Sequence, residues 1–187
     1  MRTFIGVELG QALRSRLEPA LGRLARLAPQ ARWVRPDSLH LTLAFLGEVP
    51  DATVPRIGEG LLKVAALHPT LELGVRGSGI FGPLDSPKVL WTGLSGAVEG
   101  LENLQRAVVV ELSPLGLAPD HQQFVPHITL ARAKSPRGDP GLERCADTLR
   151  DADFGALRVE EVILFASQTD KQGMRYHPLA SAVLGRR

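Results

Sequence analysis

The sequence contains little cysteine, no long apolar run and almost no net charge. Its single cysteine, Cys145, has no partner for an internal disulfide, which excludes the disulfide-rich class of small domains. No apolar run approaches the roughly 18 residues that a membrane span requires. The first residues, Met1 to Phe4, lack the basic-then-apolar pattern of a secretion signal. We therefore expect a cytoplasmic protein that has no membrane partner.

The remaining composition is that of an ordinary folded protein. The chain has 187 residues, of which 44% are hydrophobic and 22% are charged, and this balance excludes the disordered and collagen-like classes. A chain of this length buries about 70% of its unfolded surface, so its core can support folding without a disulfide or a metal. No low-complexity linker divides it. We expect a single domain over residues 1–187 that acts as a monomer.

The charged residues are nearly balanced in number but unevenly placed. There are 22 basic and 20 acidic residues, which gives a formal net charge of +2. Two windows, Pro19–Pro36 and His121–Gly138, contain no aspartate or glutamate. Their cations are Arg23, Arg26, Arg32, Arg35, Arg132, Lys134 and Arg137. These windows indicate either a locally positive surface suited to phosphates or a chance clustering on a solvated face.

Hydrophobic periodicity predicts strands and helices in mixed order. Strands are expected at residues 3–9, 33–34, 39–46, 71–75, 88–94, 127–133, 157–167 and 176–184, and helices at 13–27, 51–67, 97–115 and 142–149. The elements keep no regular strand–helix–strand alternation. This order favours an α+β fold with mainly antiparallel sheets over a doubly wound parallel sheet.

One short pattern occurs twice in the chain. It reads His-Leu-Thr-Leu-Ala at residues 40–44 and His-Ile-Thr-Leu-Ala at residues 127–131, 87 residues apart and close to half the chain length. This spacing indicates two similar lobes related by an approximate two-fold axis, with one copy in each. We therefore expect two pseudo-symmetric lobes of mainly antiparallel sheet, with outer helices, around a central cleft.

Strand geometry predicts where these side chains point. Side chains of an extended strand alternate between its two faces, so His40 and Thr42 are expected on one face. The apolar residues Leu41, Leu43 and Phe45 are expected on the other face, packed against helices. The second copy repeats the arrangement. If both strands face one cleft, that cleft contains two imidazoles and two hydroxyls.

Two imidazoles and two hydroxyls in one cleft fit an in-line displacement at phosphorus. That reaction needs a base on the attacking oxygen and an acid on the leaving oxygen, at opposite ends of one axis. Histidine serves in either role because its ordinary pKa lies near neutrality, and threonine hydroxyls can donate hydrogen bonds to the non-bridging oxygens. A lone His-x-Thr occurs often by chance, whereas two copies favour catalysis. The copies are nearly equivalent, so the residues alone do not say which histidine is the acid.

Longer segments around the two copies resemble the 2H phosphoesterase superfamily. They read Trp-Val-Arg-Pro-Asp-Ser-Leu-His-Leu-Thr-Leu-Ala-Phe-Leu-Gly-Glu-Val at residues 33–49 and Phe-Val-Pro-His-Ile-Thr-Leu-Ala-Arg at residues 124–132. Within the superfamily they are most similar to the bacterial and archaeal RNA 2′,3′-cyclic phosphodiesterases, also called 2′-5′ RNA ligases. Residues 1–9 and 89–93 fit the same family, so the resemblance covers nearly the whole chain.

The resemblance implies an enzyme without metal or cofactor that opens an RNA-terminal 2′,3′-cyclic phosphate, or that of a nucleotide, to a 2′-phosphate. It implies that His40 is the proton donor to the leaving O3′ and that His127 is the base that activates water. Thr42 and Thr129 would hold the phosphate oxygens. Arg132, just past the second copy, would be a further phosphate or RNA contact.

The chain departs from this family at Ala44, where relatives often carry Lys or Arg. A basic contact beside the first copy is therefore missing, which bears on RNA affinity more than on the chemistry. Three other functions remain compatible with the residues: reversible 2′-5′ RNA ligation, hydrolysis of small cyclic nucleotides, and RNA binding without catalysis. Two intact His-Thr pairs argue against the last, because binding alone needs no acid and base at mirrored positions.

Other candidate residues are expected to have structural roles. Gly77–Gly82 matches a dinucleotide-binding pattern, but prolines follow where a helix would have to begin, so we interpret it as a loop lining the cleft. The histidines outside the two copies, His68, His121 and His177, have no zinc-ligand spacing and are expected at structural or surface positions. Trp33 is interpreted as core packing. Phe124 is equally compatible with packing and with stacking on a base.

Overall fold

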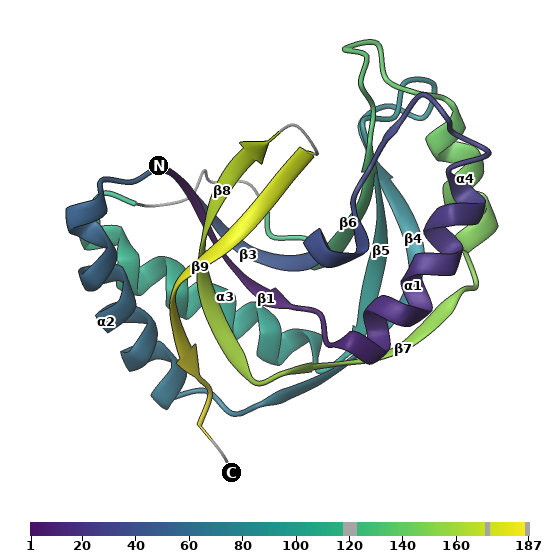
Figure 1. Cartoon of the computed structure of the whole chain (residues 1–187). Coiled ribbons are helices and arrows are strands. Elements are labelled where there is room, and N and C mark those ends of the chain that lie inside the picture. Colours follow the sequence, from purple (N-terminus) through teal and green to yellow (C-terminus); the bar gives the residue numbers. More distant parts are fainter. Residues whose placement is uncertain (118–122, 171–172, 186–187) are drawn as a thin grey trace.

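The computed structural model describes residues 1–117, 123–170 and 173–185, which form nine strands and four α-helices (Figure 1). The strands are β1 (Arg2–Glu8), β2 (Arg32–Trp33), β3 (His40–Glu48), β4 (Leu71–Phe81), β5 (Val89–Gly96), β6 (His127–Arg132), β7 (Asp153–Val159), β8 (Glu161–Asp170) and β9 (Gly173–Val183). The helices are α1 (Gln11–Leu24), α2 (Val54–Ala66), α3 (Val98–Leu112) and α4 (Gly141–Leu149), with short 3-10 turns at Pro36–Ser38, Asp51–Thr53 and Ser113–Leu115.

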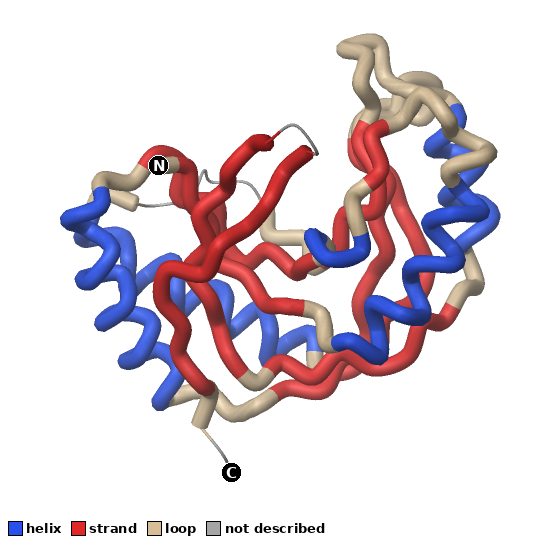
Figure 2. Tube along the Cα trace, viewed as in Figure 1, coloured by secondary structure: helices blue, strands red, loops and turns tan. Residues whose placement is uncertain are grey.

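All nine strands belong to one curled sheet. Its order is β7-β4-β5-β6-β3-β1-β8-β9, with β2 paired to β6, and each of these strand pairs is antiparallel. The helices lie on the outer side of the curl (Figure 2), where α2 packs on β8 and β9, and α4 packs on β4 and β5. The predicted α+β class with antiparallel pairing is confirmed. The two expected lobes are halves of this one continuous sheet.

The two halves of the sheet are interleaved in sequence. One half contains β1, β3, β8 and β9, so the C-terminal hairpin lies beside the N-terminal strand. The other contains β2, β4, β5, β6 and β7, and α1 packs against β7 although it directly follows β1. Each half still carries one copy of the repeated pattern, on β3 and on β6.

Within the described residues, the two halves of the sheet meet at a single cross-strand pair, Leu41 on β3 and Ile128 on β6. Both side chains are 0% exposed and belong to the one large core cluster that runs beneath both halves. The apolar residues that alternate with the histidines and threonines therefore attach both copies of the pattern to a common core.

Both β3 and β6 carry a β-bulge at the same place in the repeated pattern. Leu43 is the extra residue in β3 and Leu130 is the extra residue in β6. An inserted residue reverses the alternation of side chains beyond it, so Phe45 and Arg132 turn onto the face of the histidines. The prediction that Phe45 shares the apolar face of Leu41 is wrong: its side chain is 59% exposed.

Two boundaries differ from the sequence-based expectation. The segment Gly77–Gly82 is not a loop, because β4 continues to Phe81 after a bulge in which Gly77 has a φ of 69°. The single strand expected at residues 157–167 is instead β7 and β8, separated at Glu160. The other predicted elements are present, with shifts of a few residues at their ends.

Close packing on β4 gives a test of the sheet. A Cβ atom at Gly79 would stand 2.1 Å from Cζ2 of Trp91 on β5, so Gly79→Ala is expected to lower the free energy of unfolding by about 1–3 kcal/mol. Gly22→Ala is the matched control, since no atom lies within 4 Å of its added Cβ and the helix gains up to about 1 kcal/mol. Urea denaturation measures the free energy of unfolding of both variants. A Gly79→Ala variant as stable as the wild type would contradict the packing described.

Candidate active site

A cavity of about 490 Å³ opens on the concave side of the sheet. Its lining comes from β1, β3, β6, β8 and β9, and from Val34 just after β2. All five residues that the sequence singles out line it: His40, Thr42, His127, Thr129 and Arg132. The structure therefore brings both copies of the repeated pattern to one site.

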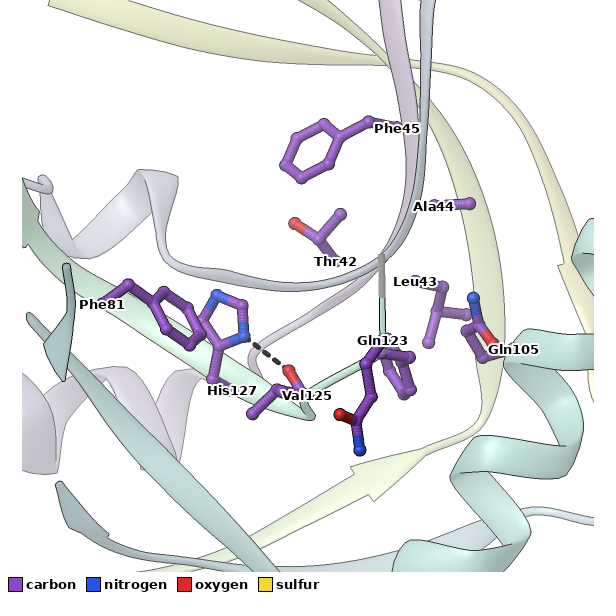
Figure 3. A pocket seen from close by; sticks show the side chains of 10 residues that line it. Thr42, Leu43, Ala44, Phe45, Phe81, Gln105, Gln123, Val125 and His127 are labelled. Carbon is purple, nitrogen blue, oxygen red and sulfur yellow. Dashed lines mark hydrogen bonds between the residues drawn. The ribbon is translucent and has the colours of Figure 1, made fainter. Parts of the chain in front are cut away.

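The buried pair between β3 and β6 explains how the two copies meet. In its antiparallel register, His40 and Thr129 lie on one side of this pair along the strands, and Thr42 and His127 lie on the other. Figure 3 shows Thr42 and His127 on the wall of a neighbouring pocket that adjoins this cavity. All four side chains line the same cavity, two from each strand, as an approximate two-fold axis would arrange them.

The two imidazoles are held in the same way. His40 Nδ1 lies 2.8 Å from the carbonyl oxygen of Ser38, and His127 Nδ1 lies 2.6 Å from that of Val125 (Figure 3). A carbonyl oxygen can only accept, so Nδ1 is the donor in both rings. The neutral rings therefore carry their free lone pair on Nε2, which can take up a proton and later release it.

Aromatic rings pack against each imidazole. The centre of the His40 ring lies 4.6 Å from that of Phe4 and 4.7 Å from that of Tyr176, and the His127 ring lies 4.8 Å from Phe81. These contacts restrict rotation of the imidazoles. Sequence reasoning missed Phe4 and Tyr176, which carry no pattern of their own. Phe81 belongs to the glycine-rich segment that was expected to line the cleft.

Burial sets the protonation of both histidines in the free protein. Desolvation lowers the pKa of His40 to about 4, with further lowering by the positive charges of Arg132 and His127, while the hydrogen bond to Ser38 opposes the shift. Desolvation also lowers the pKa of His127, again with help from Arg132 and against the hydrogen bond to Val125. Both rings are therefore neutral near pH 7 without a ligand.

The charges that line the cavity are positive. Among the described lining residues, Arg2 and Arg132 are the only ones with a permanently charged side chain, and none is an aspartate or a glutamate. Burial raises the pKa of Tyr176, and the charge of Arg132 partly offsets that rise. A cavity of this charge favours an anionic ligand.

A second cavity of about 470 Å³ adjoins the first on the side of His127 (Figure 3). It shares Thr42, Phe45 and His127 with the first cavity and is otherwise lined by uncharged residues, Phe124 among them. Phe124 also packs against the core cluster, which confirms the packing interpretation, and stacking on a base stays a prediction. Ala44 contributes to the same wall and is only 4% exposed.

The remaining candidates lie away from this site. The ring of Trp33 packs on the core and its Nε1 donates to the carbonyl oxygen of Ala28 at 3.0 Å. His68 Nδ1 lies 2.8 Å from the carbonyl oxygen of Val64, His177 is exposed on β9, and His121 lies outside the described residues. Within the described ranges, no three His, Cys, Asp or Glu side chains gather where they could hold a metal ion.

Comparison with known proteins identifies the family. The family model described as LigT-like phosphoesterase matches two successive segments, residues 7–91 and 94–176, and each contains one His-x-Thr. A protein of Methanothermobacter thermautotrophicus is 30% identical over 94% of this chain and 95% of its own length. A protein of Aeropyrum pernix is 34% identical over 85% of this chain and 93% of its own length. Both relatives are named RNA 2′,3′-cyclic phosphodiesterase.

Solved structures agree with this assignment. A protein of Thermus thermophilus superposes with a TM-score of 0.83 at 28% identity, over 100% of both chains. Escherichia coli LigT superposes with a TM-score of 0.76 at 25% identity, over 99% of this chain and 98% of its own. The curled sheet and the paired motifs are those of a 2H phosphoesterase. The chain belongs to the LigT-like phosphoesterase family, and it is therefore a hydrolase of phosphate esters.

No helix in the described part of the chain combines the length and the apolar character that crossing a bilayer would need.

The neutral state of the histidines can be tested by NMR titration. In the free protein we expect the His40 ring to stay neutral until the pH falls to about 4, with its proton on Nδ1. Inorganic phosphate should raise the pKa of both rings, because a nearby anion favours the charged form. His40→Gln and His127→Gln assign the resonances. A His40 that titrates at or above its ordinary pKa without phosphate contradicts the burial described.

Proposed function

We propose that this chain hydrolyses RNA-terminal 2′,3′-cyclic phosphates to 2′-phosphates, with His40 as the proton donor and His127 as the proton acceptor. The observation that carries the proposal is the matched pair of imidazoles, each held through Nδ1, in one cavity that Thr42 and Thr129 also line. The names of the relatives support the substrate. Escherichia coli LigT has been solved with 3′-AMP and with phosphate, which supports a nucleotide phosphate as ligand.

In this mechanism the phosphorus lies between the two imidazoles. Nε2 of His127 takes a proton from water as the water oxygen attacks phosphorus, and Nε2 of His40 gives its proton to O3′ as the O3′–P bond breaks. The bond to O2′ stays intact, so the product carries a 2′-phosphate. One proton enters the pair and one leaves it, so the charge of the pair is unchanged. Exchange with solvent then moves the proton from His127 back to His40 before the next turnover.

The hydroxyls and the arginine act on the charge that develops during attack. Thr42 and Thr129 donate hydrogen bonds to the non-bridging oxygens, where negative charge accumulates in the transition state. Arg132 adds a positive charge on the same cavity wall. Because these groups are fixed on strands of one sheet, they need little reorganisation as the reaction proceeds.

Binding of the anionic substrate promotes protonation of the histidine pair. Both rings are neutral in the free protein, and the anionic diester raises their pKa values when it binds. The reaction needs one proton shared between the two rings, and it proceeds from the form in which His40 holds it.

Substitution of either histidine tests the proposal. His40→Ala and His127→Ala are each expected to lower kcat/KM on a cyclic-phosphate-ended oligonucleotide by about 10²- to 10⁴-fold, with unchanged circular dichroism. His177→Ala, at an exposed position on β9, is the control and should keep wild-type activity. Wild-type activity should also survive a chelator. A double variant that retains wild-type turnover, or a 3′-phosphate product, would rule out this mechanism.

The pH dependence of the rate gives an independent test. Both histidine pKa values lie below their ordinary 6.5 in the free protein, so the bell-shaped profile of kcat/KM should peak at acidic pH and decline as the pair loses its proton. The profile of kcat reports the substrate complex, in which both pKa values are higher, so its peak should lie at higher pH. A kcat/KM that continues to rise above about pH 8 would contradict a shared proton on this pair.

A further inference from the structure

Two arginines oppose each other directly at the edge of the active-site cavity. Arg32 on β2 is the cross-strand partner of Arg132 on β6, and both side chains are exposed. Directly opposed residues of an antiparallel pair point to the same face, and like charges placed there destabilise the pair. Within the described residues, the ion pairs involve neither arginine. This uncompensated repulsion is relieved if an anion binds between the two.

More cations lie along this edge on both sides of the arginine pair. Lys134 and Arg137 are exposed on the loop that follows β6, on the side away from the cavity, whereas Arg35 is exposed after β2 beside the cavity-lining Val34. The loop is fixed to the start of β5, because Ala133 N donates to the carbonyl oxygen of Lys88 at 2.8 Å and Lys88 Nζ donates to that of Pro136. We call this surface the β2–β6 rim: Arg32, Arg35, Arg132, Lys134 and Arg137. It unites the two acid-free windows of the sequence on one side of the site.

A second route out of the site, past His127, has a different character. The second cavity is lined by uncharged residues and, through Gln105, Gln123 and Phe124, adjoins a shallow hollow at α3. That hollow contains one carboxylate, Glu102, and one cation, Arg106, whose charges offset each other. Among the described residues, a polyanion therefore meets a favourable electrostatic path over the β2–β6 rim and no net positive charge in the α3 hollow.

We propose that the β2–β6 rim binds the phosphodiester backbone of the RNA strand that precedes the cyclic phosphate, so that the enzyme prefers RNA ends to cyclic mononucleotides. This inference rests on the proposed function, since it takes the cyclic end to lie between the histidines. Arginine recognises phosphate through two parallel hydrogen bonds, and Arg132 stands where the terminal nucleotide leaves the cavity. Arg32 and Arg137 then meet phosphates further along the strand.

The experiment compares 2′,3′-cyclic AMP with a single-stranded RNA of about eight nucleotides that ends in a 2′,3′-cyclic phosphate. Wild-type kcat/KM should be higher for the RNA and should fall with salt between about 50 and 200 mM, whereas that for the mononucleotide should change little. Arg32→Gln and Arg137→Gln should each raise the RNA KM about three- to tenfold and reduce the salt slope by about 0.7. Their turnover of 2′,3′-cyclic AMP should stay within about twofold of wild type.

Arg106→Gln, in the α3 hollow, is the matched control and should leave kcat/KM unchanged for both substrates. If Arg106→Gln raises the KM for the RNA while Arg32→Gln does not, the strand leaves by the α3 hollow and the rim proposal is wrong. Equal kcat/KM for both substrates with no salt dependence also overturns it, while leaving the phosphodiesterase intact. Turnover of neither substrate would instead overturn the proposed function itself.

Discussion

The site depends on one cross-strand contact, the pairing of Leu41 with Ile128. It is the only described pair between β3 and β6, yet it sets the register of two strands that each present a histidine and a threonine. A slip by one residue would turn one strand's polar side chains into the core and its leucines into the cavity. The complete burial of both side chains opposes such a slip, so the packing of two apolar residues fixes the distance between two imidazoles.

The repeated pattern was enough to predict which residues meet, because alternation in a strand is a strong constraint over three residues. It placed His40, Thr42, His127 and Thr129 on the faces they occupy. Beyond the third residue it failed at Phe45. The bulge at Leu43 leaves no trace in the sequence, since two successive apolar residues fit a regular strand as well as a bulged one.

Long-range pairing could not be predicted from local periodicity. The C-terminal hairpin lies beside β1 and brings Tyr176 to His40, and nothing in either segment encodes the other as its partner. The glycine-rich stretch before Gly82 was mistaken for a loop for a physical reason. Its glycines leave room for the Trp91 ring on a strand, and glycine-rich strands look like loops in composition.

The matched bulges turn two unlike side chains, Phe45 and Arg132, onto equivalent positions of the two copies of the repeated pattern. If the two copies were identical, a phosphodiester would bind equally well in two opposed orientations. In half of the complexes, the proposed roles of His40 and His127 would then be exchanged. An aromatic ring on one side and a guanidinium on the other remove that degeneracy. In the proposed mechanism, this difference between Phe45 and Arg132 distinguishes the two orientations in which a cyclic phosphate could bind between the histidines.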